Sequence, residues 1–301
     1  MKLFLEKYLL PIAMILGIAF NKQLSSLSHL LPLLIAIMLF ITYCRVKLDD
    51  IKLTKFHYIL LAIQYIGSAL VYLLLKPINE ILAQGAMICV LTATATSAPV
   101  VAGLLGGNIS VTAAYSIISN LSVAFIAPLF LSLIGHTSEN IPFITSFWQI
   151  LLNVMLILIA PFILAFILQK ISSKTHKKIQ SAQIVSFYIW AVALTIVIGN
   201  VTNNVKVMAD DGAFRLEIII ATVSLMICLM QFYFGRKIGA KFVYRVEGGQ
   251  GLGQKNTVLA IWLTQTYLNP LASIGPGAYV LWQNLVNSWQ IWRHAKSTRK
   301  H

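Results

Sequence analysis

The sequence has little charge and very few acidic residues. Asp and Glu number 9 among 301 residues, and all charged residues together make 11% of the chain, against about a quarter in an average soluble domain. With 58% hydrophobic residues, a folded soluble protein could not cover its surface with so few charges. Lipid must therefore be the solvent for most of the chain, and the composition predicts an all-α polytopic membrane protein.

Cysteine and centrally placed ionisable residues are also scarce, which excludes several classes of function. The three cysteines, Cys44, Cys89 and Cys228, lie far apart in or beside apolar runs, so they indicate core positions and not a disulfide framework or metal site. The six histidines fall at expected helix ends, in loops or at the terminus, which disfavours haem ligation or a buried histidine catalyst. The acidic residues lie in similar places, which disfavours a lipid-processing enzyme and a pump with a buried aspartate pair.

Long apolar runs are abundant. A helix needs about 20 apolar residues to cross a bilayer, and ten candidate spans are bounded by charged or turn residues. The first resembles a signal peptide, but Glu6 and Lys7 interrupt it and no small-x-small cleavage site follows Phe20, so we interpret it as a retained helix. The candidate spans are 4–20, 30–44, 57–75, 79–105, 109–135, 147–169, 179–199, 216–235, 246–268 and 272–292.

The basic residues predict the orientation of these spans. With a cytoplasmic N-terminus, 18 Lys and Arg residues fall in cytoplasmic pieces, 4 in outer pieces, and Lys255 inside a span. One missed helix would swap the sides of every later loop, so this asymmetry supports ten spans. We expect a multi-pass protein of the cell (inner) membrane with both termini cytoplasmic. The net charge of +14 is then an orientation signal, and no nucleic-acid partner is expected.

An internal repeat divides the chain into two halves. The pattern Ala-Tyr, four residues, Asn-Leu occurs at 114–121 and again at 278–285, in the last expected span of each half. Five spans per half force the second half to enter the membrane from the opposite side, which is the inverted repeat of many secondary transporters. The expected halves are 1–136 and 137–301.

The fourth span of each half contains residues that interrupt a helix. In the first half, Thr96 and Ser97 precede Pro99, which predicts either a simple proline kink or an unwound segment whose free backbone groups line a site. In the second half, four glycines within 248–253 precede the polar block 254–257. A nucleotide-binding glycine loop is disfavoured because no strand precedes it. Paired interruptions at corresponding positions point to a transport site.

Lys255 is the most informative single residue. A lysine near the bilayer centre costs about 2.5–3.5 kcal/mol on insertion scales, so its side chain must face protein or water. It either snorkels to the cytoplasmic surface, or forms a buried ammonium that binds an anionic substrate or stands in the place of a coupling cation. A buried ammonium could also exchange a proton. Gln64 and Asn120, on the spans that flank the first interruption, are further candidates for the site.

The polar motifs around the interruptions carry a resemblance to a known family. They are Gln254-Lys255-Asn256-Thr257, Asn269-Pro270, Gly275-Pro276-Gly277-Ala278-Tyr279 and Trp282-Gln283-Asn284 in the second half, with Gln64, Thr96-Ser97-Ala98-Pro99, Gly107-Asn108, Thr112 and Ser116 in the first. Together they resemble the bile acid:sodium symporter family over roughly residues 55–135 and 240–292.

The resemblance implies a fold and a set of sites. The fold is ten transmembrane helices in two inverted five-helix repeats, with broken helices 4 and 9 crossing in a core made of helices three to five and eight to ten. By resemblance, Gln64 contributes to one Na⁺ site and Thr112 and Ser116 to the other. Asn256 matches the asparagine of the family's Gln-Asn motif.

The sequence departs from the family at several of these positions. The family's Ser-Asn pair on helix four is Ala98-Pro99 here, and the glutamine of the Gln-Asn motif is Lys255. The glutamate that the family shares between its sodium sites falls near Gln250-Gly251, and Glu247 is too far from Asn256 to replace it. These departures argue against the usual two-sodium coupling.

The sequence therefore predicts a secondary active transporter of a small organic anion that works by alternating access. No cofactor is expected, Na⁺ and H⁺ are the candidate coupling ions, and the partners are the organic anion and the lipid bilayer. A sodium-dependent, bile-acid-like symporter and a non-transporting membrane sensor remain alternatives, and the oligomeric state stays open. The candidate binding residues are Gln64, Thr96, Ser97, Pro99, Thr112, Ser116, Asn120, Gln250, Gln254, Lys255, Asn256 and Thr257.

Overall fold

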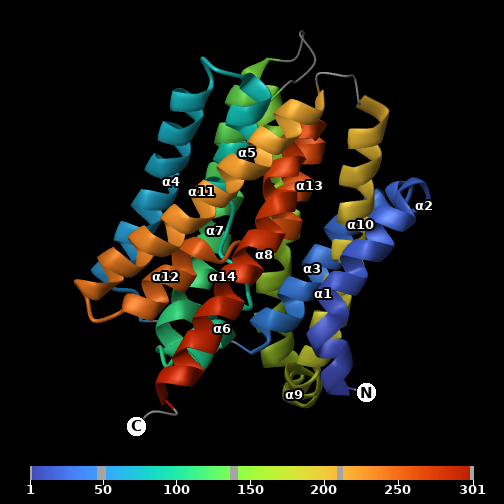
Figure 1. Cartoon of the computed structure of the whole chain (residues 1–301). Coiled ribbons are helices and arrows are strands. Elements are labelled where there is room, and N and C mark those ends of the chain that lie inside the picture. The colour runs from blue at the N-terminus through green and yellow to red at the C-terminus, as the bar shows by residue number, and fades with distance from the viewer. Residues whose placement is uncertain (1, 46–51, 136–141, 209–212, 299–301) are drawn as a thin grey trace.

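The computed structural model describes residues 2–45, 52–135, 142–208 and 213–298, and all the regular structure in these ranges is helical (Figure 1). The expected boundary between the halves, at 136/137, lies outside the described residues. The same holds for Lys47, Arg299 and Lys300, which entered the orientation argument.

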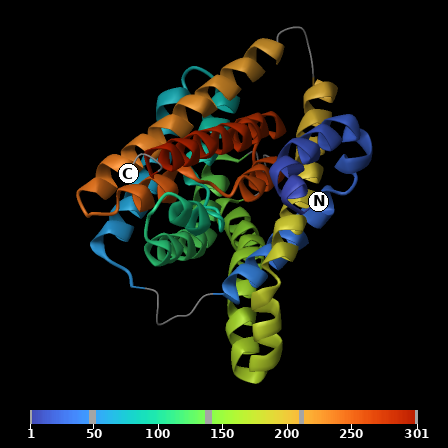
Figure 2. The ribbon, with the colours of Figure 1, turned by 60° about the horizontal axis from the view of Figure 1, so that its bottom comes forward.

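The helices form two groups that lie side by side (Figures 1 and 2). In one group, packing joins α1 to α10, α2 to α10, α3 to α8 and α10, and α8 to α9. In the other, α4 packs on α5, α6 on α7, and α11 on α5, α12 and α14. The first group comprises α1 (Lys2–Ala19), α2 (Asn21–Ser25), η1 (Ser28–Leu30), α3 (Leu31–Tyr43), α8 (Phe143–Ile171), α9 (Ser173–Ser181) and α10 (Gln183–Met208). The second comprises α4 (Lys55–Leu75), α5 (Glu80–Leu91), α6 (Ala98–Leu104), α7 (Ile109–Ile134), α11 (Ala213–Ala240), α12 (Arg245–Gly253), α13 (Thr257–Tyr267), η3 (Pro270–Ser273) and α14 (Ile274–Thr298).

Five helices in the described ranges, namely α4, α7, α8, α10 and α11, are long and apolar enough to cross a membrane. The shorter helices α3 and α5 are also apolar. Large apolar side chains on these helices face outward: Leu74 is 72% exposed, Ile171 77% and Val207 76%. Exposed apolar surface on this scale fits lipid and not water, so the chain is a membrane-embedded helical protein. Cys44, Cys89 and Cys228 are buried and free, as expected for core positions.

Two of the expected spans are each made of two helices. The span at 79–105 consists of α5 and α6, separated by six non-helical residues. Pro99 occupies the first turn of α6, where a missing N–H leaves no hydrogen bond unmade, so the simple proline kink is wrong. The span at 246–268 consists of α12 and α13, which are separated by Gln254, Lys255 and Asn256.

Two further expectations are corrected. The glycine-rich stretch 248–253 is not unwound, because α12 is helical through all four of its glycines. The seventh span, expected at 179–199, begins at Gln183 and continues to Met208, since the basic residues before it form the separate helix α9.

Glycines at the helix contacts allow very close backbone approach. A Cβ built on Gly248 would lie 2.2 Å from the carbonyl oxygen of Gly235 in α11. A Cβ on Gly275 in α14 would lie 2.6 Å from the carbonyl oxygen of Gly85 in α5. Small residues at such contacts let helices associate closely in lipid, which explains why α12 tolerates so many glycines.

Two glycines of α14 offer a matched test of this packing. We expect Gly275→Ala to destabilise the protein by about 1–3 kcal/mol, because backbone must move to admit the methyl group. Gly277 has only ordinary contacts, with Val201 Cγ1 at 3.8 Å from its ideal Cβ, so Gly277→Ala should be neutral or slightly stabilising. Thermal unfolding of the two purified variants measures the difference, and equal effects would contradict the packing argument.

Candidate functional site

The non-helical segments of the two divided spans lie against each other. Thr94 and Lys255 pair as an antiparallel bridge, with the Ala95 N–H donating to the Gln254 carbonyl at 2.9 Å and the Asn256 N–H donating to the Ala93 carbonyl at 2.8 Å. Backbone groups released at helix ends must find partners inside a membrane protein. Each segment therefore supplies part of what the other needs, and we call residues 92–97 and 254–256 the crossing.

Side chains cover the carbonyl oxygens at the end of α5. The last carbonyls of a helix have no partner within it. Gln231 Nε2 donates to the Cys89 carbonyl at 3.1 Å, and Gln64 Nε2 donates to the carbonyls of Leu91 at 2.8 Å and Thr92 at 3.2 Å. Two amide side chains, one from α4 before α5 in the chain and one from α11 after it, thus cover this helix end.

Lys255 supplies the remaining donor at this helix end. Its Nζ donates to the carbonyls of Val90 at 2.8 Å and Thr92 at 3.1 Å, while its backbone N–H donates to Gln283 Oε1 at 2.8 Å. The side chain is 1% exposed, so the interpretation that it snorkels to the surface is wrong. A cation at a helix C-terminus is stabilised by the helix dipole, and this ammonium contacts carbonyl oxygens.

Gln64 also accepts hydrogen bonds, which ties α4 to α7. Its Oε1 accepts from Tyr115 Oη at 2.9 Å and from Ser119 Oγ at 3.1 Å. Ser119 Oγ in turn accepts from the Thr94 N–H at 3.2 Å. The amide of Gln64 is therefore fully engaged, and it joins α4, α7 and the crossing into one buried network.

Ser116 and Asn120 reach the crossing from α7, whereas Thr112 does not. Ser116 Oγ lies 3.4 Å from the Thr94 carbonyl and 3.3 Å from that of Ala95. Asn120 Nδ2 donates to the Thr94 carbonyl at 3.0 Å. Thr112 Oγ1 bonds the Asn108 carbonyl of its own helix turn at 3.2 Å.

The side chains of the candidates on the second divided span point in different directions. Gln254 Nε2 donates to Ser97 Oγ at 2.8 Å and so bridges the two segments. Gln250 points toward α14 instead, because its Nε2 donates to Asn287 Oδ1 at 3.0 Å and Gln290 Oε1 at 3.3 Å. Asn256 caps α13, its Oδ1 accepting from the Leu259 N–H at 3.2 Å.

The other three sequence candidates differ in exposure. Thr257 is buried at the start of α13, whereas Thr96 and Pro99 are half-buried and Ser97 is exposed. Thr96 and Ser97 therefore mark the accessible side of the crossing, and Lys255 lies on its closed side.

Sequence reasoning missed several residues of this network. Gln231 and Ser119 were not predicted as site residues, and Tyr115 was noted only as part of the repeated motif, yet each is buried and bonded at or beside the crossing. The available signal was an amide or hydroxyl within an apolar span. Such residues bond neighbouring helices in many membrane proteins, so only the packing reveals which of them meet.

Three buried acceptor oxygens around the crossing have no hydrogen-bond partner in the described part of the chain. They are Asn120 Oδ1, Gln231 Oε1 and Gln254 Oε1. Buried acceptors are nearly always satisfied in folded proteins, so these oxygens suit a donor from outside the chain, such as water or a substrate hydroxyl. The crossing thus combines free acceptor oxygens with the buried side-chain nitrogen of Lys255.

Apolar helices whose non-helical segments meet in a buried polar crossing occur in membrane transporters, and this is the class of protein that the arrangement indicates. The model of the Sodium Bile acid symporter family matches residues 32–211, and the chain belongs to this family. It is therefore a membrane transporter of the bile acid/sodium symporter type, and members of the family are transporters and not enzymes. No curated protein sequence matches the chain.

The family match covers the first divided span but not the second. It ends at residue 211, before α11, α12, α13 and α14. The crossing therefore pairs a segment inside the matched range with Lys255 outside it.

Proposed function

We propose that the protein is a secondary active transporter of a small organic anion whose activity does not depend on Na⁺. The observation that carries this proposal is the ammonium of Lys255, buried against two carbonyl oxygens at the crossing. Carbonyl oxygens at the end of a broken helix are ligands that suit an alkali cation in transporters. Here a covalently attached cation takes that place.

Corresponding contacts support two inverted five-helix repeats, with helices 4 and 9 broken. In the first half, Tyr115 of α7 bonds Gln64 of α4; in the second, Tyr279 of α14 bonds Gln231 of α11. An asparagine follows each tyrosine by five residues. Asn120 Nδ2 donates to the Ser116 carbonyl at 2.7 Å, and Asn284 Nδ2 donates to the Val280 carbonyl at 2.6 Å. The motif repeated in the sequence thus makes similar contacts twice, on helices at equivalent positions in the halves 1–136 and 137–301.

The positions of the two chain ends and of α9 support an orientation in the membrane. The start of α1, the end of α14 and the basic helix α9 lie at one end of the bundle (Figure 1), as an even number of spans requires. We assign this end to the cytoplasm of a cell (inner) membrane by the positive-inside rule. The half-buried and exposed hydroxyls Thr96 and Ser97 are then the first contacts of an anion at the crossing during alternating access.

The residues that would hold Na⁺ in the first family site are already engaged. Na⁺ takes oxygen ligands, but the amide oxygen of Gln64 accepts two O–H groups. The carbonyls of Val90 and Thr92 accept the Lys255 ammonium. A second cation there would meet a like charge at contact distance.

We infer that Thr112 and Ser116 do not form the second family site. Thr112 bonds its own helix, and Ser116 donates its proton toward the crossing carbonyls. Gly251 and Gln250 stand where the family has its shared glutamate, and Gln250 turns toward α14. A site that lacks a carboxylate and has its hydroxyls engaged holds Na⁺ weakly, and H⁺ is the remaining candidate coupling ion.

Transport measurements test the proposal. Thermal stabilisation of purified protein by a panel of bile acids and small mono- and dicarboxylates identifies a substrate. Uptake of that substrate into proteoliposomes is then compared in NaCl and choline chloride, with and without an imposed pH gradient. We expect equal uptake in the two salts. Strict dependence on Na⁺ would favour a bile-acid-like sodium symporter, and binding without uptake would favour a membrane sensor.

A further inference from the structure

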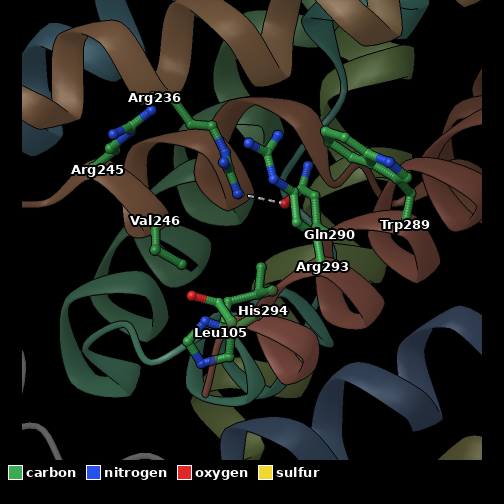
Figure 3. A pocket seen from close by; sticks show the side chains of 9 residues that line it. Leu105, Arg236, Arg245, Val246, Trp289, Gln290, Arg293 and His294 are labelled. Atoms are coloured by element: carbon green, nitrogen blue, oxygen red, sulfur yellow. Dashed lines mark hydrogen bonds between the residues drawn. The ribbon is translucent and has the colours of Figure 1, made fainter. Parts of the chain in front are cut away.

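A pocket of about 350 Å³ lies away from the crossing, where α11, α12 and α14 meet the end of α6 (Figure 3). This volume falls at the lower end of the range for small-molecule sites, about 300–1,000 Å³. None of the crossing residues lines it. Two of the elements that line it, the end of α14 and the end of α6, lie toward the end of the bundle that carries α9 (Figure 1), which the proposed orientation places in the cytoplasm.

Three guanidinium groups from three different helices line this pocket. Arg236 comes from α11, Arg245 from α12 and Arg293 from α14. Arg245 and Arg293 both repel Arg236 electrostatically, so gathering them has a free-energy cost unless an anion joins them. Among the described residues, none of the three forms an ion pair with a carboxylate. The carboxylate closest to them in sequence, Glu247, accepts from the Asn108 backbone N–H.

The donors of these arginines are only partly used. Arg236 Nη2 donates to Gln290 Oε1 at 2.7 Å, and Figure 3 shows this bond beside Arg293. Arg236 Nε is buried and has no hydrogen-bond partner within the described ranges. The Arg293 guanidinium lies over the Trp289 ring, 5.4 Å from its centroid, a contact that holds its plane while leaving its N–H edge open. Forked guanidinium donors recognise the oxygens of phosphate well.

We propose that this pocket binds a phosphate-type anion, held by Arg236, Arg245 and Arg293. The shared chemistry is a tetrahedral group with several charged oxygens, supplied either by a soluble phosphate or by the headgroup of an anionic phospholipid. The site is separate from the transported substrate and from the crossing. A substrate carboxylate has no part in it.

A thermal-shift titration with inorganic phosphate, in nanodiscs of phosphatidylcholine alone, tests the soluble source. We expect phosphate to stabilise the wild type, and Arg293→Gln to weaken the apparent affinity by about tenfold or more. Arg293 is exposed at a helix end, so this variant should fold. Lys237→Gln is the matched control, because Lys237 is an exposed cation next to Arg236 that does not line the pocket. Arg236→Lys keeps the positive charge but loses the forked donors of the guanidinium group, so it should also weaken phosphate binding.

Native mass spectrometry after purification from membranes containing phosphatidylglycerol tests the lipid source. Retention of this lipid by the wild type and by Lys237→Gln, with loss in Arg293→Gln, assigns the site to a headgroup. The proposal is overturned if neither probe binds, or if Lys237→Gln loses binding as much as Arg293→Gln does. Either result would mean that the arginines only orient the protein in the membrane.

Discussion

Replacing Lys255 by methionine lowers transport by about tenfold or more while leaving the protein folded. Methionine fills nearly the same volume but removes the charge and the donors that meet Val90 and Thr92. The dipole at the end of α5 then loses its counter-charge beside the crossing. Initial uptake rates in proteoliposomes, compared at equal amounts of inserted protein, measure the effect.

The stability of this variant should fall only modestly, because the loss of two hydrogen bonds is partly offset by the removal of a buried charge. Hydrogen bonds from a charged group contribute about 1.5–3 kcal/mol each, whereas a lysine at membrane depth costs about 2.5–3.5 kcal/mol. Lys237→Met removes a charge from an exposed position and serves as the control for both readouts. Wild-type uptake by Lys255→Met would remove the ammonium from the mechanism.

Replacing Lys255 by alanine tests whether its ammonium occupies the place of a coupling cation such as Na⁺. Lys255→Ala opens space beside the carbonyls of Val90 and Thr92 while keeping Gln64 in place. We expect NaCl to raise the melting temperature of this variant above that in choline chloride, because a ligand that binds only the folded state stabilises it. The wild type should melt at the same temperature in both salts. If neither protein melts at a higher temperature in NaCl than in choline chloride, the space left by the Lys255 side chain does not bind Na⁺.

Replacing Gln64 by leucine produces the second large effect, a loss of stability of about 3 kcal/mol or more. The substitution leaves the hydroxyls of Tyr115 and Ser119 without their acceptor and the carbonyl of Leu91 without its donor. Each such buried group costs about 1–3 kcal/mol when it cannot reach water. Thermal unfolding in detergent and the yield of folded protein both report this loss.

Tyr115→Phe is the graded comparison for Gln64→Leu. It removes one hydroxyl, while the Gln64 oxygen keeps its bond from Ser119, so the cost should be about 1 kcal/mol. Combining both substitutions should cost less than the sum of the two, because the network is shared. Strictly additive losses, or a mild Gln64→Leu variant, would contradict a network centred on this amide.

The sequence predicted a membrane-embedded helical protein and its family because these depend on composition and local pattern. Apolar runs located the helices, and the polar motifs near Gln64 and Asn256 carried the family resemblance that the match over 32–211 confirms. Pro99 marked the beginning of α6, and the polar block after Gly253 marked the end of α12. The helix bounds and the pairing of Thr94 with Lys255 could not be read in this way.

One misinterpretation and one omission show where local pattern fails. The glycines of α12 suggested unwound backbone, but Gly248 is helical and admits the carbonyl of Gly235 at a distance that a Cβ would occupy. Gln231 carried no motif, yet it covers a carbonyl at the end of α5. In both cases the partner lies on another helix, and the sequence around the residue does not identify it.

The sequence by itself determined that the chain is helical and embedded in lipid, and that a lysine lies in the polar block that interrupts an expected span. Only the tertiary structure decided what that lysine meets. Lipid leaves each backbone group to find its partner within the protein, so the choice of partner depends on which helix ends are brought together. Residues 165 positions apart in sequence, Val90 and Lys255, become neighbours for that reason.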